Sequence, residues 1–157
     1  MRPTPDPAAL IRALLTVFER VAVRDDVGDT WFGQLEVYDG PAPESGFGQQ
    51  WLAVGMPWEA DQQPVTVERA ELGGGRRVRL EYSVACAAYA GGGEPGFEQY
   101  REQVAELVAA VDAELTRDRT LAGLVGRVGI ADMALGQGAD SQGYGAMASF
   151  AIAATVI

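Results

Sequence analysis

The sequence predicts an α+β fold in which a mixed or antiparallel β-sheet carries two helices packed on one face. Two stretches repeat their apolar residues with the spacing of a helix, one near the start of the chain and one past its middle. The segments between and after them have the character of strands, with glycine and proline clusters at their ends. The resulting order of elements, α-β-β-β-β-α-β-β, collects the strands in runs, which indicates an α+β rather than an alternating α/β architecture.

The length of the chain suits a single domain. It has 157 residues, and a domain of about 150 residues buries roughly 70% of the surface that its unfolded chain exposes. We therefore assign residues 1–157 to one domain. No apolar run reaches the ~18 residues of a membrane span, and the start of the chain lacks the apolar region of a signal peptide. The single cysteine, Cys86, cannot form a disulfide within the chain, which is typical of a reducing compartment.

The first helix is predicted to begin at Pro7, with Asp6 as its N-cap. It is expected to end near residues 24–28. Its apolar face, spaced by three and four residues, consists of Leu10, Leu14, Val17, Phe18 and Val21.

Four strands are predicted between the two helices. They cover residues 34–38, 49–56, 65–72 and 76–90, and glycine- and proline-rich segments separate them. The fourth strand has the clearest alternation of apolar and polar residues. Val78, Leu80, Tyr82, Val84 and Cys86 share one face, and Arg77, Arg79, Glu81 and Ser83 share the other.

A second, longer helix is predicted over residues 97–116. Its buried stripe consists of Phe97, Tyr100, Val104, Leu107, Val108, Val111 and Leu115, and its solvent-facing side consists largely of Glu98, Arg101, Glu102, Glu106 and Glu114. Two long strands follow, over residues 124–135 and 146–157, and the glycine-rich stretch 136–145 is expected to join them as a loop.

The segment TRDRTLAGLVGRVGIADM, residues 116–133, is interpreted as a structural corner between the second helix and the next strand. Asp118 or Thr120 can cap its turn, Leu121 can fold onto the core and Gly123 can adopt a positive φ. No nucleophile stands beside a base in this segment, so we expect no chemistry there.

The composition removes most catalytic chemistry. Histidine is absent and all 12 basic residues are arginines, which excludes histidine acid–base catalysis and lysine Schiff-base chemistry. With one cysteine and no histidine, the chain cannot build the usual zinc sites. The carboxylate pair Asp25–Asp26 is interpreted as a solvated loop, because no further ligands accompany it. We therefore expect no metal ligand and no cofactor, and the groups that remain for catalysis are carboxylates, hydroxyls and Cys86.

Four segments of the chain follow one another in a characteristic order. They are VRLEYSVACAAYAGGG, FEQYREQVAELVAAVDAEL, DRTLAGLVGRVGIADM and GAMASFAIAATVI. Together they resemble the tail terminator proteins of long-tailed, siphovirus-like phages, of prophages and of gene transfer agents. The turn Asp-x-Thr-Leu-x-Gly at residues 118–123, followed by a strand, a glycine-rich hairpin loop and a β C-terminus, carries most of the likeness. The loop at residues 40–49 and an insert at residues 58–75 lie outside it.

The resemblance implies a small α+β subunit that closes into a hexameric ring. It also implies assembly rather than catalysis, so that we expect no catalytic residue and a protein that is not an enzyme. Such a ring caps the finished tail tube, stops its polymerisation and joins the tail to the head connector. The implied partners are further copies of the chain, the major tail tube protein and a head–tail connector or neck protein, with no membrane involved. The implied location is the tail–neck junction of the virion, after assembly in the host cytoplasm. A net charge of −10 suits a ring through which DNA passes without tight binding.

Arginines at one predicted hairpin are candidate interface residues. Arg76, Arg77 and Arg79 lie at the mouth of this hairpin in an otherwise acidic chain. We expect them to contact an acidic neighbour, which is the next subunit, the tube or the connector. A solvated strand end is the equally weighted alternative, because exposed charges contribute little.

Two tryptophans and two nearby carboxylates are the remaining interface candidates. Tryptophan is favoured at interface hot spots, and Trp58 lies in a loop together with Glu59 and Asp61. Trp51 opens a predicted strand, and packing under the sheet is the simpler interpretation there. Trp31 is expected to anchor the loop after the first helix.

Two other functions stay open from the sequence. The first is another head–tail joining, neck or tube-like protein of the same particle. The second is a small soluble α+β enzyme or ligand-binding domain, which a deep polar pocket with converging carboxylates would favour.

Overall fold

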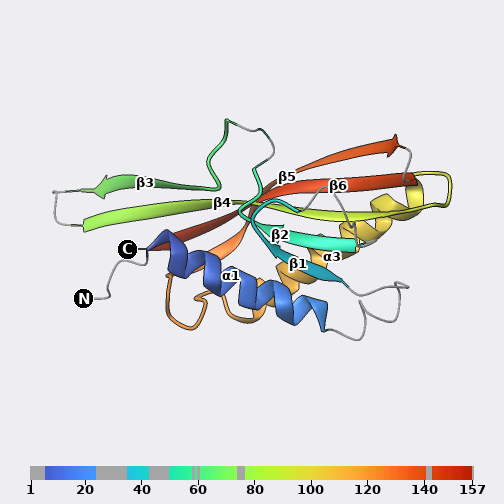
Figure 1. The fold of residues 1–157 in the computed structure, drawn as a ribbon. Coiled ribbons are helices and arrows are strands. Elements are labelled where there is room, and N and C mark those ends of the chain that lie inside the picture. The colour runs from blue at the N-terminus through green and yellow to red at the C-terminus, as the bar shows by residue number, and fades with distance from the viewer. Residues whose placement is uncertain are drawn as a thin grey trace.

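The computed structural model describes residues 6–23, 35–42, 50–57, 59, 61–73, 77–140 and 143–156. Its elements are α1 (Pro7–Ala22), β1 (Glu36–Asp39), β2 (Gln50–Val54), β3 (Val65–Leu72), β4 (Arg77–Gly92), α3 (Glu98–Arg117), β5 (Arg127–Asp140) and β6 (Gly143–Val156). One mixed, six-stranded sheet and two helices give the α+β fold that the sequence predicts. Figure 1 shows both helices on the same side of the sheet.

The sheet is built around β4. Along one side of β4 runs β6, antiparallel, and β5 pairs with β6. On the other side, the first half of β4 pairs with β3 and the second half with β2, and β1 lies parallel to β2. The two halves meet at Ala85, whose carbonyl accepts from the N–H of Gly55 at 2.8 Å and whose N–H donates to the carbonyl of Pro64 at 2.9 Å. Residues 58–75, expected as an insert, therefore contribute β3 to the sheet.

Helix α1 forms as its sequence predicts. The Asp6 carboxylate accepts a hydrogen bond from the N–H of Ala9 at 2.6 Å, which caps the first turn, and proline occupies the first helical position. The helix ends at Ala22. All members of its predicted apolar face are buried, namely Leu10, Leu14, Val17, Phe18 and Val21.

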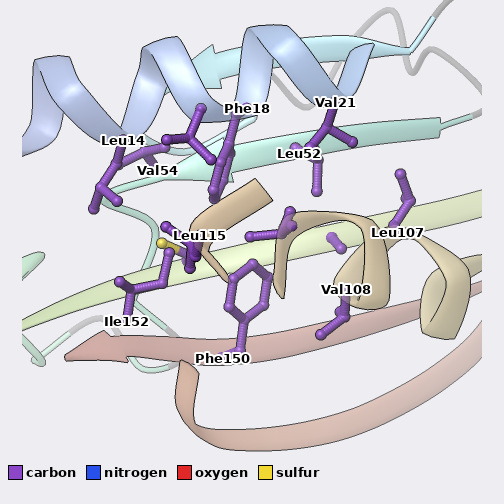
Figure 2. Packing of buried hydrophobic residues seen from close by; sticks show 14 of the residues in the cluster. Leu14, Phe18, Val21, Leu52, Val54, Leu107, Val108, Leu115, Phe150 and Ile152 are labelled. Atoms are coloured by element: carbon purple, nitrogen blue, oxygen red, sulfur yellow. The ribbon is translucent and has the colours of Figure 1, made fainter. Parts of the chain in front are cut away.

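The main core lies between the two helices and one face of the sheet. The ring centroids of Phe18 in α1 and Phe150 in β6 lie 6.2 Å apart. Figure 2 shows both rings in this core. Leu107 and Leu115 of α3 and Ile152 of β6 are buried in the same core. The alternation predicted for β4 is confirmed, because Tyr82, Val84 and Cys86 belong to this core. Ala148, Phe150 and Ile152 of β6 belong to it as well.

The C-terminal hairpin is longer than the sequence suggests. The prediction ended one strand at residue 135, began the next at 146 and joined them by a loop, whereas β5 continues to Asp140 and β6 begins at Gly143. Glycine is disfavoured in strands, so the glycines at the ends of β5 and β6 indicated a loop rather than strand pairing. The glycines are tolerated because the backbones pack closely here: a Cβ on Gly143 would lie 2.3 Å from the carbonyl oxygen of Gly92.

One residue of α3 was assigned to the wrong side of the helix. Glu114 was expected largely on the solvent-facing side, yet it is 7% exposed. Its carboxylate lies 3.3 Å from the guanidinium of Arg117, one turn later. The reason is that α1 packs against this flank of α3, and Val17 of α1 lines the same small cavity as Glu114.

Candidate functional site

The face of the sheet that points away from the helices carries small and polar side chains. Successive residues of a strand point to opposite faces. In β6, Phe150 and Ile152 belong to the main core, whereas Ser149 and Ala151 point the other way. We call this second face, formed by alternate residues of β2, β4, β5 and β6, the open face. Within the described part of the chain, no helix packs on it.

Trp51 lies on the open face in a small aromatic cluster. It is 3% exposed, and its indole stacks on the ring of Tyr89 with centroids 5.3 Å apart and planes 14° apart. Tyr38 meets the indole edge-on at 6.2 Å. Ala53 and Ala87 complete the cluster. The structure therefore packs Trp51 against the sheet, in line with the simpler interpretation, and a role for it at an interface stays a prediction.

A hollow of about 750 Å³ lies next to this aromatic cluster. The rings of Trp51 and Tyr89 contribute to its lining, and glycines of β5 and β6, among them Gly138 and Gly145, supply much of the rest. Tyr89 lies so close to β6 that a Cβ on Gly145 would be 2.5 Å from its hydroxyl oxygen. The hollow thus presents apolar rings and bare backbone, which suits contact with another chain or an apolar group.

A second hollow, of about 490 Å³, lies further along the same face. The residues that line it include Ser83, Ser149 and one acidic residue, Asp132. Cys86 also contributes, but burial raises the pKa of its thiol to about 12, so the reactive thiolate is not formed near neutral pH. Among the residues that line this hollow, no second carboxylate converges on Asp132.

The structure describes part of the hairpin that carries Arg76, Arg77 and Arg79. Arg79 lies 3.2 Å from Glu81, and both side chains are about half exposed, which limits the pair to roughly 0–1 kcal/mol of stabilisation. Arg76 and the side chain of Arg77 lie outside the described residues. Sequence reasoning missed Arg127, which lines a hollow of about 500 Å³ together with Arg79. Two cations therefore share this end of the sheet.

The other predicted interface residues lie in or near the loop between β2 and β3. Glu59 and Asp61 are exposed, and the carbonyl of Glu59 accepts from the N–H of Gln62 at 3.1 Å. Trp58 lies outside the described residues, as do Asp25–Asp26 and Trp31. Among the residues that the structure describes, no three acidic, cysteine or histidine side chains gather in a way that could hold a metal ion.

The corner after α3 folds as a capped turn. The Asp118 carboxylate accepts hydrogen bonds from the Thr120 hydroxyl at 2.8 Å and from the Thr120 and Ala122 N–H groups at 3.1 and 2.7 Å. The Thr120 hydroxyl bond, followed by the two backbone bonds, lowers the pKa of Asp118. Leu121 is buried against the core, and Leu121, Ala122 and Gly123 all have positive φ, at 49°, 58° and 84°. The structural interpretation of this segment is confirmed.

Exposed apolar residues on the edge strands were missed from the sequence. Met133 and Leu135 of β5 are 53% and 50% exposed, and Val67 of β3 is 46% exposed. Their alternation with smaller or polar neighbours is that of an ordinary half-buried strand. What separates these residues from core residues with the same pattern is the position of β3 and β5, each of which has a single partner strand in the described structure.

Comparisons with known proteins add no relative. No protein-family model matches the chain, and no curated protein matches it significantly.

Neither helix of the described structure has the length and apolar character that crossing a membrane requires.

Proposed function

We propose that this protein is a structural subunit that closes into a ring, caps a phage-type tail tube and joins the tail to the head connector. The observation that carries the proposal is the position of the exposed apolar side chains. Val67 lies on β3, and Met133 and Leu135 lie on β5, at edges on opposite sides of β4 that no other described strand covers. Free edges with apolar side chains favour pairing with another chain. The proposal therefore assigns the chain to assembly rather than to catalysis.

The resemblance described above supports the same function. It implies a small α+β subunit, and the fold has that architecture. The turn at residues 118–123, which carries most of the likeness, forms a well-capped corner between α3 and β5. On this proposal the partners are further copies of the chain, the tube protein and a connector or neck protein, and the place of action is the tail–neck junction of a virion.

The acidic character of the chain requires charge pairing within such an assembly. With a net charge of −10 per subunit, neighbouring copies repel one another unless arginines meet carboxylates. We propose that the hairpin with Arg76, Arg77 and Arg79 docks on an acidic neighbour. The double substitution Arg76→Glu/Arg77→Glu should then prevent ring formation or attachment to the tail, whereas Arg12→Glu/Arg119→Glu, which changes the net charge equally, should not. Equal assembly of both variants would argue against docking through this hairpin.

Deletion of the gene tests the proposed function, with negative-stain electron microscopy of the resulting particles. A subunit that ends polymerisation should, when missing, leave tails of uncontrolled length that are not attached to heads, and an intact copy should restore normal particles. Tails of normal length separated from heads would instead assign the chain to another joining or neck protein. A complete lack of tails would indicate a tube subunit. Unaltered particles would refute a role in the virion and favour a small soluble enzyme or binding domain.

A further inference from the structure

The exposed apolar side chains of β3 and β5, two of the strands that have a single partner strand in the described structure, lie on the same face of the sheet. Val67 of β3 stands opposite the core residue Tyr82, and Met133 of β5 stands opposite the core residue Phe150. Leu135 follows Met133 by two residues and shares its face. All three therefore point to the helix side of the sheet. If one sheet continued into another, these side chains would lie on one continuous surface.

Beyond an irregularity between Ile130 and Asp132, the edge formed by β5 lacks the usual protection against pairing. Natural edge strands are short, charged, interrupted by proline or covered. β5 has 14 residues and, within the described part of the chain, pairs with β6 alone. Its segment MALGQGA, residues 133–139, contains neither a charged residue nor a proline. Such an edge is suited to receive a further strand.

We propose that β5 of one copy pairs with β3 of a second copy, antiparallel and head to tail, so that Val67 contacts Met133 and Leu135 across the junction. The inference rests on the proposed function, because it names the surfaces through which the ring closes. Strand directions agree with it. β3 is antiparallel to β4, β4 to β6 and β6 to β5, so β3 and β5 of one copy run in opposite directions. Rotation about a ring axis preserves direction along that axis, and the neighbour's β3 therefore meets β5 antiparallel.

The offset between the two edges also fits a closed ring. Through the strand pairing, Val67 lies level with Tyr82 of β4, whereas Met133 and Leu135 lie level with Cys86 and Ala88. This offset along the strands is about 13–20 Å at about 3.3 Å per residue. One repeat of β3, β4, β6 and β5 is about 19 Å wide at about 4.8 Å per strand. Strands tilted by about 35–45°, as in closed sheets, produce an offset of this size between successive copies.

A head-to-tail contact also explains why the two edges differ. Pairing of β5 with β5 would use the same surface twice, and association would stop at a dimer. Pairing of β5 with β3 leaves the other of these two edges unpaired on each newly added copy, so that copies continue to add until the ring closes. The edge of β3 is the shorter one, with 8 residues against 14 in β5.

Cysteine cross-linking of the full chain tests this contact. Val67→Cys and Leu135→Cys are made separately, mixed and treated with a short bismaleimide. Val23→Cys, which lies at the end of α1 and is 79% exposed, replaces Val67→Cys in the control mixture. The native Cys86 is buried, so it should not react and can stay in place. The same samples are imaged by negative stain, which separates the fate of the contact from that of the ring.

The proposal predicts a cross-linked dimer in the mixture of Val67→Cys and Leu135→Cys, and none in either variant alone or in the Val23 control. A Val67→Cys/Leu135→Cys double variant should give a ladder that ends at the size of the closed ring. Rings without the mixed product would overturn the β3–β5 contact and leave the proposed function intact. A dimer from Leu135→Cys alone would replace it by a symmetric contact. A cross-linked product that extends into open filaments would support the β3–β5 contact and contradict closure into a ring.

Discussion

The ring of Tyr89 lies against the buried indole of Trp51, with centroids 5.3 Å apart and planes inclined by 14°. Tyr89 can occupy this position because Gly91 and Gly145 lie beneath it. A Cβ added to Gly145 would come within 2.5 Å of the tyrosine hydroxyl oxygen, and one on Gly91 within 2.2 Å. The aromatic cluster on the open face therefore depends on glycines in two neighbouring strands.

Gly145→Ala should displace Tyr89 and disturb its stacking on Trp51. We expect a loss of about 1–3 kcal/mol in the free energy of unfolding, because the added methyl group has no space. Chemical denaturation measures this loss, and near-ultraviolet circular dichroism reports the aromatic stack. Gly138→Ala is the matched control, since Gly138 pairs directly with Gly145 and a Cβ there meets nothing within 4 Å. Equal stability of the two variants would show that Tyr89 does not depend on Gly145.

Ala122→Gly should stabilise the protein. Ala122 is exposed and has φ of 58°, a left-handed conformation that costs a residue with a Cβ about 1–2 kcal/mol. Glycine avoids that cost but loses about 0.5–1 kcal/mol of chain entropy, so we expect a gain of up to about 1.5 kcal/mol. Ala109→Gly, at an exposed position of α3, should instead cost about 1 kcal/mol. Thermal unfolding of both variants checks the opposite signs; a destabilised Ala122→Gly protein would contradict the strained turn.

Asp118→Ala should lower the unfolding midpoint at neutral pH, since it removes the acceptor of three hydrogen bonds in the corner after α3. The pKa of Asp118 is lowered in the folded state. Its carboxylate therefore stabilises the fold above the unfolded value of about 3.9, and this contribution is lost as the pH falls through the folded-state pKa. The difference between wild type and variant should accordingly shrink below about pH 3.9.

Thermal unfolding from neutral to acidic pH measures this difference for Asp118→Ala. Asp112→Ala, an exposed carboxyl on α3, matches the change in net charge and should have little effect at neutral pH. A difference for Asp118→Ala that grows as the solution is acidified would contradict the assigned role.

Much of the fold follows from local patterns. Asp6 and Pro7 predict the start of α1. The apolar residues that recur at helical spacing before Ala22 are the ones that the helix buries. The alternation in β4 is equally direct, because Val84 and Cys86 point to the core and Glu81 is exposed. In these elements the local propensity and the tertiary packing agree.

The misassigned features depend on contacts that no local pattern contains. Glu114 is buried because α1 packs on its flank, and an isolated helix has no such flank. The long β5–β6 hairpin was missed because its pairing passes through glycines at 136, 138, 143 and 145, which locally favour a loop. Leu135 is exposed because β5 lies at an edge. The order of strands in the sheet decides this, and it involves partners far apart in the sequence.

Leu135→Glu should abolish association while leaving the subunit folded. The side chain is half exposed, so the substitution should change the free energy of unfolding by less than about 1 kcal/mol. At the proposed edge contact, however, a buried carboxylate without a partner opposes pairing. Val23→Glu is the control, because Val23 lies at the end of α1, outside β3 and β5, and is more exposed than Leu135. Sedimentation velocity should show smaller species for Leu135→Glu only; equal behaviour of the two variants would exclude β5 as a contact.

Imaging the head-proximal end of purified tails by electron cryo-microscopy, with this chain fitted to the map, tests the central proposal most directly. The proposal predicts copies of the chain in one closed ring on the last layer of the tube, joined through the edges of β3 and β5. A tail end that is complete without this chain, while the purified subunit remains solitary at every concentration, would contradict it.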